Sequence, residues 1–105
     1  MVVTILEARV APDRVEELHR RFKVDTLPLA PGIHETYLLH DDATDDATDG
    51  SLVRIVTVWS SRQALEAMRD AARASGAKPK GVEVLEAVGA LPQLSVLDVL
   101  VHHTK

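Results

Sequence analysis

The most informative run in the chain is LVRIVTVWSSRQALEAM, residues 52–68. Its first half, residues 52–59, is β-branched and apolar, which predicts a strand. Ser60 then stands as an N-cap with Gln63 three residues later, a capping box, and apolar residues follow at helical spacing. The run therefore predicts a strand that turns directly into a helix, which we expect to end near Gly76.

The residues before this run predict a strand, a helix and a second strand. Residues 2–11 alternate, so that Thr4, Leu6, Ala8 and Val10 share one face of the first strand. Residues 12–27 begin with Pro and acidic residues and repeat apolar positions at helical spacing. A connector rich in Pro and Gly then leads into a strand at residues 33–40, because those residues resume the apolar strand pattern.

An acidic segment, DDATDDATDG, spans residues 41–50 between two predicted strands. A calcium loop of the EF-hand type, read from Asp45, would place Ala47 at a ligand position and Val56 where a bidentate Glu is needed. Asp, Thr and Gly are also the residues that favour turns. The segment is therefore interpreted as a long hairpin loop, and no metal site is expected.

The C-terminal third contains the last elements of the predicted fold. Residues 76–81 form a loop, and residues 82–90 fit either a short helix or a strand, of which we expect the helix. Residues 94–103, LSVLDVLVHH, are nearly all apolar and predict a last strand that is buried on both faces. The order β-α-β-β-α-β predicts an α+β class: one ferredoxin-like domain of residues 1–105 with an antiparallel four-stranded sheet.

Composition narrows the class of protein. With 46% apolar residues and only 3% aromatic residues, the core must consist mainly of Val, Leu, Ile and Ala. The absence of Cys excludes disulfides, thiolate metal sites and a Cys nucleophile. A net charge of −4 argues against nucleic acid as a partner. No apolar run is long enough for a membrane span and no leader segment precedes the first strand, so a cytoplasmic protein is expected.

The predicted sheet has more apolar surface than two helices can cover. The strands at residues 33–40 and 52–59 carry large apolar side chains on both faces, whereas helices cover one face only. A second copy of the same sheet is the simplest cover, so we expect a homodimer. Arg54 is expected to pair across this interface with Glu35 or Asp98.

The segment TVWSSRQAL, residues 57–65, and PGI, residues 31–33, resemble the antibiotic biosynthesis monooxygenase family of the dimeric α+β barrel superfamily. The resemblance covers most of residues 2–75. It implies a dimeric barrel and a small monooxygenase that oxidises an aromatic polyketide-type substrate without metal or flavin. The superfamily also includes haem-degrading enzymes and relatives with isomerase or signalling-related roles, so the fold by itself does not decide the function.

The haem-degrading relatives use a Trp, which resembles Trp59, together with an Asn on the first strand and an axial His on or near the second helix. Ala8 stands at about the position of that Asn, and the chain contains no Asn at all. No His occurs between Asp41 and Val101. Two of the three characteristic residues are absent, so haem degradation is disfavoured and no cofactor is expected.

A cofactor-independent oxygenase needs a base for an electron-rich phenol or enol, and His has a suitable pKa of about 6.5. His34, expected on one face with Thr36 and Leu38, and Tyr37 are the catalytic candidates. His19 is expected to be a half-buried packing residue of the first helix. The expected substrate-binding residues are Trp59, Ala8, Leu6 and Met68.

The leading hypothesis is a small cofactor-independent monooxygenase acting on an apolar, aromatic, quinol or polyketide-type small molecule. Two alternatives stay open. One is a non-catalytic ligand-binding or accessory dimer of the same fold, and the other is an isomerase or cyclase that uses the same base without oxygen. A proton-handling group that points into a cavity would separate the enzymes from the binding protein.

Overall fold

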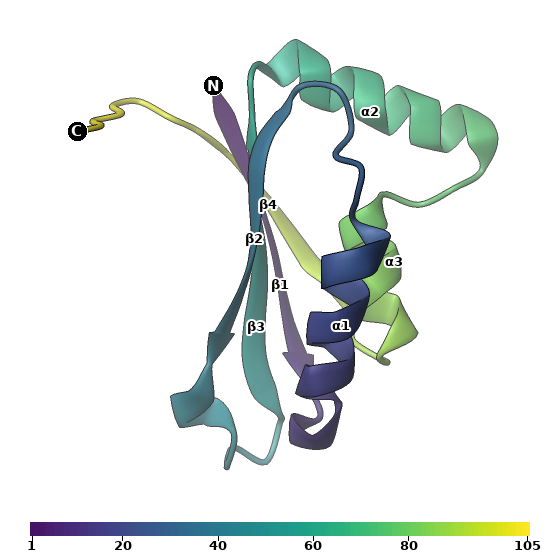
Figure 1. Cartoon of the computed structure of the whole chain (residues 1–105), viewed down its shortest axis with the longest axis vertical. Helices are drawn as coiled ribbons and strands as arrows, with labels where there is room; N and C mark the ends of the chain where they lie inside the picture. Colours follow the sequence, from purple (N-terminus) through teal and green to yellow (C-terminus); the bar gives the residue numbers. More distant parts are fainter.

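The computed structural model describes all 105 residues. Its four strands form one antiparallel sheet in the order β2-β3-β1-β4, and three helices accompany the sheet (Figure 1). This architecture confirms the predicted α+β class and the ferredoxin-like order of elements. The elements are β1 (Val2–Val10), η1 (Pro12–Arg14), α1 (Val15–Asp25), β2 (Ile33–Asp41), η2 (Asp42–Thr44), β3 (Ser51–Trp59), α2 (Arg62–Ser75), α3 (Lys80–Ala87) and β4 (Gln93–Asp98).

All three helices lie on one face of the sheet, which Figure 1 shows nearly edge-on. The even-numbered residues of β1 face these helices, as the alternation in the sequence predicts. Within this chain nothing covers the opposite face, which we call the open face. Arg54 lies there and pairs within the chain with Glu7, its neighbour on β1, at 2.7 Å, and its expected pairing with Glu35 or Asp98 across a dimer interface stays a prediction.

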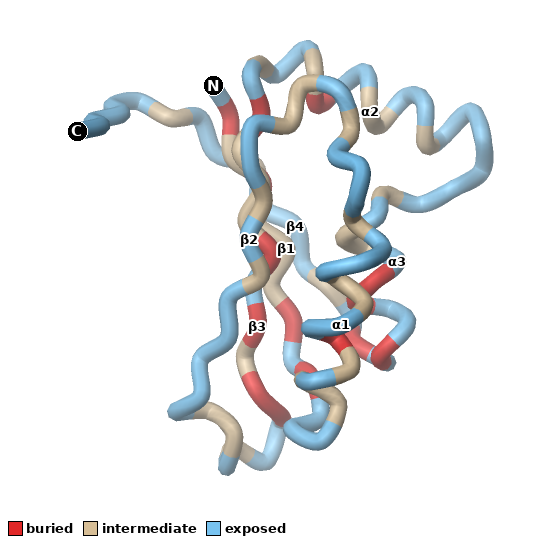
Figure 2. Tube along the Cα trace, in the orientation of Figure 1, coloured by how far each residue is buried: buried red, intermediate tan, exposed pale blue.

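The core consists of two buried clusters on the helix side of the sheet (Figure 2). The larger cluster joins β1 and β3 to α1 and α3, and its centre includes the fully buried Leu18 and Leu85. The smaller one contains Val2, Trp59 and Leu65 beneath the start of α2. His19 is exposed, so its expected packing role is wrong, because Leu18 occupies the core-facing position of α1.

The start of α2 differs from the prediction by one residue. Ser61 is the N-cap, and its Oγ accepts a hydrogen bond from the Ala64 N–H at 3.1 Å. The backbone N–H of Ser60 still donates to the Gly32 carbonyl at 2.8 Å, which holds Ser60 next to β2. The predicted capping box is therefore wrong, whereas the predicted end at Gly76 is confirmed, since Gly76 adopts a left-handed φ of 73°.

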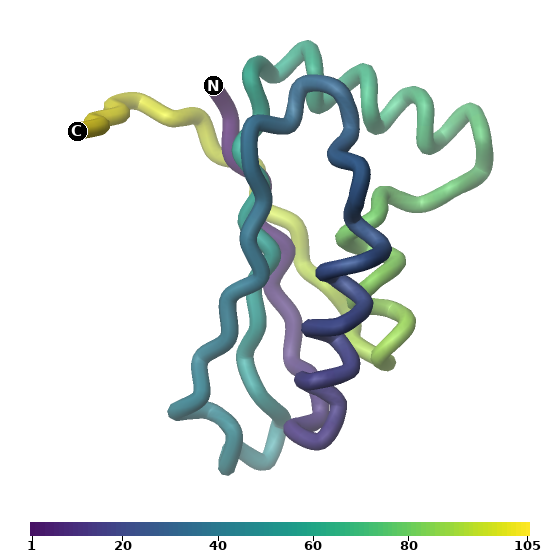
Figure 3. The backbone as a smooth tube through the Cα atoms, viewed as in Figure 1, coloured from purple at the N-terminus to yellow at the C-terminus, as the bar shows by residue number.

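The last predicted strand is shorter than expected. β4 ends at Asp98, and the chain then leaves the sheet as an exposed tail (Figure 3). The expectation of burial on both faces is wrong, because β4 is an edge strand with Leu94 and Leu97 each 52% exposed. The predicted short helix before it is confirmed as α3. None of the helices combines the length and the apolar character that crossing a membrane requires.

The acidic segment forms a structured hairpin loop in which the carboxylates have separate partners. Asp41 accepts from the Ala43 N–H, and Asp49 lies 3.6 Å from Arg9. Asp45 accepts from the Ser51 hydroxyl at 2.6 Å and contacts the His40 ring at 2.7 Å. These two contacts, the Ser51 hydrogen bond first, hold the pKa of Asp45 below its ordinary value.

Candidate functional site

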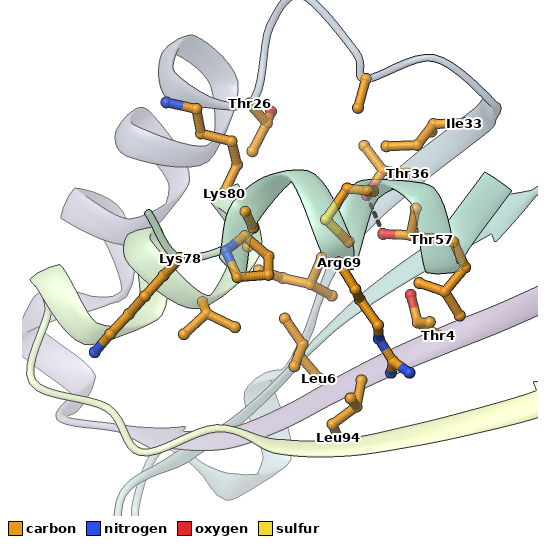
Figure 4. Close-up of a pocket in the computed structure, with 18 of the residues that line it drawn as sticks. Thr4, Leu6, Thr26, Ile33, Thr36, Thr57, Arg69, Lys78, Lys80 and Leu94 are labelled. Atoms are coloured by element: carbon orange, nitrogen blue, oxygen red, sulfur yellow. Dashed lines mark hydrogen bonds between the residues drawn. The ribbon is translucent and has the colours of Figure 1, made fainter. Parts of the chain in front are cut away.

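A cavity of about 650 Å³ lies between the two core clusters. The sheet forms its floor, α2 and the start of α3 form its walls, and the segment between α1 and β2 closes one side (Figure 4). Its lining is mainly apolar, with Leu6 and Ile55 from the strands and Leu65 and Met68 from α2. A cavity of this size and character accommodates a ligand of two or three fused rings.

The position of Gly81 helps to create this space. Gly81 lies in the first turn of α3 and lines the cavity. A Cβ at this position would come within 2.9 Å of the Leu6 Cδ1 atom on the cavity floor. The missing side chain therefore lets α3 pack closely on the sheet without filling the cavity.

The floor contains one polar row in apolar surroundings. Thr36 on β2, Thr57 on β3 and Thr4 on β1 are in register across three neighbouring strands, and all three line the cavity. The hydroxyls of Thr36 and Thr57 are hydrogen bonded at 2.9 Å. The Trp59 indole N–H donates to the Thr4 hydroxyl at 3.1 Å. We call these three residues the threonine row.

The threonine row has donors to spare. Thr4 accepts from Trp59 but its own O–H has no protein acceptor, and only one of the two hydroxyls in the Thr36–Thr57 pair can donate to the other. Two O–H donors therefore remain for a ligand. In a mainly apolar cavity, such donors favour a ligand oxygen that carries negative charge.

The titratable groups of the lining are three bases and one acid. Lys78 donates to Glu86 at 2.6 and 3.1 Å, and Lys80 lies 3.8 Å from Glu83. Figure 4 shows both lysine ammonium groups directed away from the floor, whereas the guanidinium of Arg69 extends from α2 toward the strands that carry Thr4 and Leu94. Arg69 makes no ion pair and no side-chain hydrogen bond within the chain, unlike its helix neighbours Arg62 and Arg73.

Three of the four expected binding residues, Leu6, Trp59 and Met68, line the cavity. Trp59 is 3% exposed and holds the Thr4 hydroxyl in place. Ala8 does not line this cavity, because it faces the larger core cluster one step further along β1 and is 4% exposed. The lining of the cavity begins at Leu6 on this strand.

Neither catalytic candidate lies in the cavity. A β-bulge interrupts the pairing between Ile33 and Glu35, so that Ile33 lines the cavity while His34, the extra residue, is exposed and does not. The expectation that His34 shares a face with Thr36 is therefore wrong. Tyr37 lies on the open face, 45% exposed, where it donates to Glu35. That hydrogen bond is the main cause that raises the pKa of Tyr37.

The sequence reading missed the threonine row and Arg69. The row could have been found, because Thr4 is the single polar residue on the otherwise apolar face of β1, and Thr57 lies on the buried face of β3, which carries the odd-numbered residues 51–59. Arg69 follows Met68 and lies one turn after Leu65, at the border of the apolar stripe of α2. An arginine at such a border can expose its charged end while its aliphatic stem lies along apolar surface, so the sequence alone does not assign it to either face.

A family model described as "Antibiotic biosynthesis monooxygenase" matches residues 1–79. These residues carry β1, β2, β3 and α2, and with them the threonine row and Trp59. No curated protein matches the chain.

Several solved structures share the fold. The haem degrader MhuD from Mycobacterium tuberculosis, with two haems bound in its active site, has 23% identity and a TM-score of 0.64, covering 99% of this chain and 100% of that chain. SnoaB from Streptomyces nogalater, a cofactor-independent oxygenase, has 18% identity and a TM-score of 0.58, covering 99% and 97%. A structure described as an antibiotic biosynthesis monooxygenase has 13% identity and a TM-score of 0.62, covering 95% and 99%. At these identities the likeness establishes the fold alone.

Proposed function

This chain belongs to the antibiotic biosynthesis monooxygenase family, and from that premise we propose that it is a small oxygenase for an aromatic, quinol or polyketide-type molecule. The observation that carries the proposal is the threonine row on the floor of an otherwise apolar cavity. Apolar walls bind fused rings, and the two free O–H donors bind a ring oxygen.

The chemistry that suits such a cavity is oxidation of an electron-rich ring by oxygen itself. Loss of a proton from a phenol or enol gives an anion that can pass an electron to oxygen. In the net reaction a ring CH₂ and O₂ give C=O and water, so that one oxygen atom enters the product and the other leaves with the two substrate hydrogens. Hydroxyls of the threonine row would stabilise the ring oxyanion, and the apolar walls would exclude bulk water.

The residues that line the cavity of one protomer include no free base. A group that takes the proton would therefore have to come from outside this lining. His34 and Tyr37 remain our candidates, and because neither lines the cavity, their participation would require a second protomer or a rearrangement of the start of β2. Their substitution is informative for that reason. If His34→Ala and Tyr37→Phe both leave turnover unchanged, neither residue transfers the proton.

A haem-dependent reaction of the MhuD kind does not suit the lining residues. Haem iron held by a protein needs an axial ligand, most often an imidazole. None of the five histidines lines the cavity, and Met68 supplies its only sulfur. We therefore propose oxygenation without a cofactor.

We also propose a homodimer in which two open faces pack together. Tyr37, Leu39 and Leu97 are 45%, 50% and 52% exposed on this face, while Val56 and Val58 lie between them on the sheet. A sheet face with exposed apolar side chains of this kind can pack against its own copy about a two-fold axis.

Oxygen uptake tests the enzymatic proposal. The protein would be offered anthrones, naphthols and hydroquinones in an oxygen electrode, with and without a chelator, and the product would be analysed after reaction under ¹⁸O₂. The expected result is chelator-insensitive uptake well above autoxidation, with one labelled oxygen in the product. Thr57→Val should lower this rate and the matched Thr57→Ser should retain it, because Ser keeps the hydroxyl. Uptake no faster than the protein-free blank across the panel would reject the oxygenase.

A second candidate is a non-catalytic ligand-binding dimer. The observation that favours it is the absence of a free base among the lining residues: Glu86, their single carboxylate, is already paired with Lys78. Saturable binding of the same molecules in folded protein, without oxygen uptake, would establish a ligand-binding protein in place of the oxygenase.

A further inference from the structure

We propose that Arg69 makes the cavity selective for ligands that carry a carboxylate, so that the bound molecule is an aromatic acid rather than a neutral ring compound. This inference rests on one part of the proposed function, namely that the cavity binds a ring compound. It adds the chemical class of the ligand and assigns its recognition to one residue.

The first support is the isolation of Arg69 among the basic residues of α2. Arg62 pairs with Asp98 at 2.8 Å, and Arg73 lies 3.8 Å from Asp70. Arg69 has neither kind of partner, although it is half-buried and lines the cavity. A half-buried guanidinium has lost part of its hydration, and without a counter-ion nothing in the chain compensates for that loss. A ligand carboxylate would supply the missing partner.

The second support is the direction of the side chain. Arg69 extends over the cavity toward Thr4 and Leu94, whereas the Lys78 and Lys80 ammonium groups point away (Figure 4). Its planar guanidinium can donate two parallel hydrogen bonds to one carboxylate, which a lysine cannot do. Arg69 is therefore the one cation placed to contact a ligand inside the cavity.

The third support is the charge of the rest of the chain. The protein carries a net charge of −4, with five of its acidic residues in the loop at residues 41–50. That loop lies at the end of the sheet opposite α2 (Figure 1). An acidic protein repels anions in general, so a cavity for an anion requires a local unpaired cation. Arg69 meets this requirement at the end of the sheet where the cavity lies.

These positions also indicate the pattern of groups on the ligand. A carboxylate on Arg69 and an oxygen on the threonine row would be carried by one ring system, because Arg69 extends toward the strand that carries Thr4. The remaining ring surface would contact Leu6 and Ile55. A hydroxy aromatic acid carries both groups, and 3-hydroxy-2-naphthoate is a probe of suitable size when oxygen is excluded, so that it binds without being oxidised.

The test compares 3-hydroxy-2-naphthoate with its methyl ester, which has the same rings and hydroxyl but no charge. Trp59 is the only tryptophan and lines the cavity, so quenching of its fluorescence reports occupancy directly. The wild-type protein should bind the acid at least about tenfold more tightly than the ester, the gain typical of a hydrogen bond to a charged group. Arg69→Ala should remove this preference, because it weakens binding of the acid far more than binding of the ester. Arg73→Ala, one turn along α2, is the matched control and should keep the preference.

The outcomes separate this inference from the proposed function. Equal binding of acid and ester by the wild type, or an undiminished preference in Arg69→Ala, would overturn the role of Arg69 while leaving a cavity that binds rings. Failure of both probes to bind the wild type would reject the cavity as a ring-binding site and the proposed function with it. Circular dichroism checks the fold of each variant. Arg69→Gln replaces Arg69→Ala should the latter fail to fold, and the comparison of the two probes on the wild type needs no variant.

Discussion

The indole of Trp59 and the hydroxyl of Thr4 form a buried hydrogen bond that connects β3 to β1 through side chains. Thr4→Val keeps the shape of the side chain but leaves the indole N–H without an acceptor, since no other protein group accepts from it. We expect Thr4→Val to lower the free energy of unfolding by about 1–3 kcal/mol, the cost of an unpaired buried donor. Urea unfolding followed by circular dichroism would measure the difference.

Thr4→Ser is the matched control for this prediction. Serine retains the acceptor oxygen, so its loss of stability should be smaller than that of Thr4→Val. If the valine variant is as stable as the wild type, the hydrogen bond contributes nothing and the threonine row is not held in place by Trp59.

Asp45 is the residue whose ionisation we expect to affect stability with pH. Its pKa lies below the ordinary 3.8 because Ser51 donates to it and His40 lies beside it. A lowered carboxyl pKa stabilises the folded protein above pH 3.8, and this stabilisation disappears as the pH falls through the folded pKa. The wild type should therefore have a higher melting temperature than Asp45→Asn at neutral pH, and this difference in melting temperature should disappear below pH 3.8.

Melting temperatures between pH 7 and pH 2.5 would test this, and Asp46→Asn serves as control because Asp46 is exposed and makes no hydrogen bond or ion pair. A gap between wild type and Asp45→Asn that is constant over the whole range would show that the effect does not come from the ionisation of Asp45.

For individual residues, the sequence predicted the apolar residues that line the cavity better than the polar ones. Leu6, Trp59 and Met68, the expected substrate-binding residues, do line the cavity, because burial follows strand and helix periodicity. His34 was misplaced because a β-bulge, which shifts the alternation by one residue, leaves no clear mark in a single sequence. Arg69 was missed because its proposed role depends on its having no counter-charge while Arg62 and Arg73 each have one, and only the packed structure reveals that.

Among the elements, the start of α2 offers a direct comparison of sequence and structure. Ser61 caps the helix through the Ala64 N–H, whereas the Ser60 side chain makes no hydrogen bond. Ser61→Ala should therefore destabilise the protein by about 1 kcal/mol, as lost N-caps do. Ser60→Ala is the control and should change stability by much less.

Chemical denaturation of both variants would decide between the two serines. A larger loss for Ser60→Ala than for Ser61→Ala would restore the capping box that the sequence suggests, and would mean that α2 begins one residue earlier than described.

The elements themselves were predictable where periodicity and end signals agreed. β1, β3 and α2 each combine a clear period with Pro, Ser or Gly at their ends, and their predicted bounds lie within two residues of the observed ones. The segment after Asp98 was not predictable, because Leu100 and Val101 look like core residues although they are 90% and 73% exposed. A sequence does not distinguish residues buried within one chain from residues that an interface would cover.

For the whole molecule, the one-sided arrangement of helices leads to the clearest prediction. Val56 lies on the open face, on the inner strand β3. Val56→Glu would place a charge in the centre of the proposed interface, where its desolvation opposes association. Light scattering should give twice the chain mass of 11.5 kDa for the wild type and the single mass for Val56→Glu.

Ala74→Glu is the control for charge alone, because Ala74 is exposed on α2 and does not line the cavity. It should remain dimeric. A wild-type protein that scatters as a monomer at micromolar concentration would refute the homodimer, and the open face would then need another explanation.

Gly81 has a consequence for how this cavity can change in evolution. Every glycine codon becomes an alanine or a valine codon by one nucleotide substitution, and both products favour a helix more than glycine does. At this position, however, an added Cβ would press on the Leu6 side chain at the floor of the cavity. The size of molecule that the protein accepts is therefore one point mutation away from change. Selection for a stiffer α3 and selection for a bulky ligand act in opposite directions on the same codon.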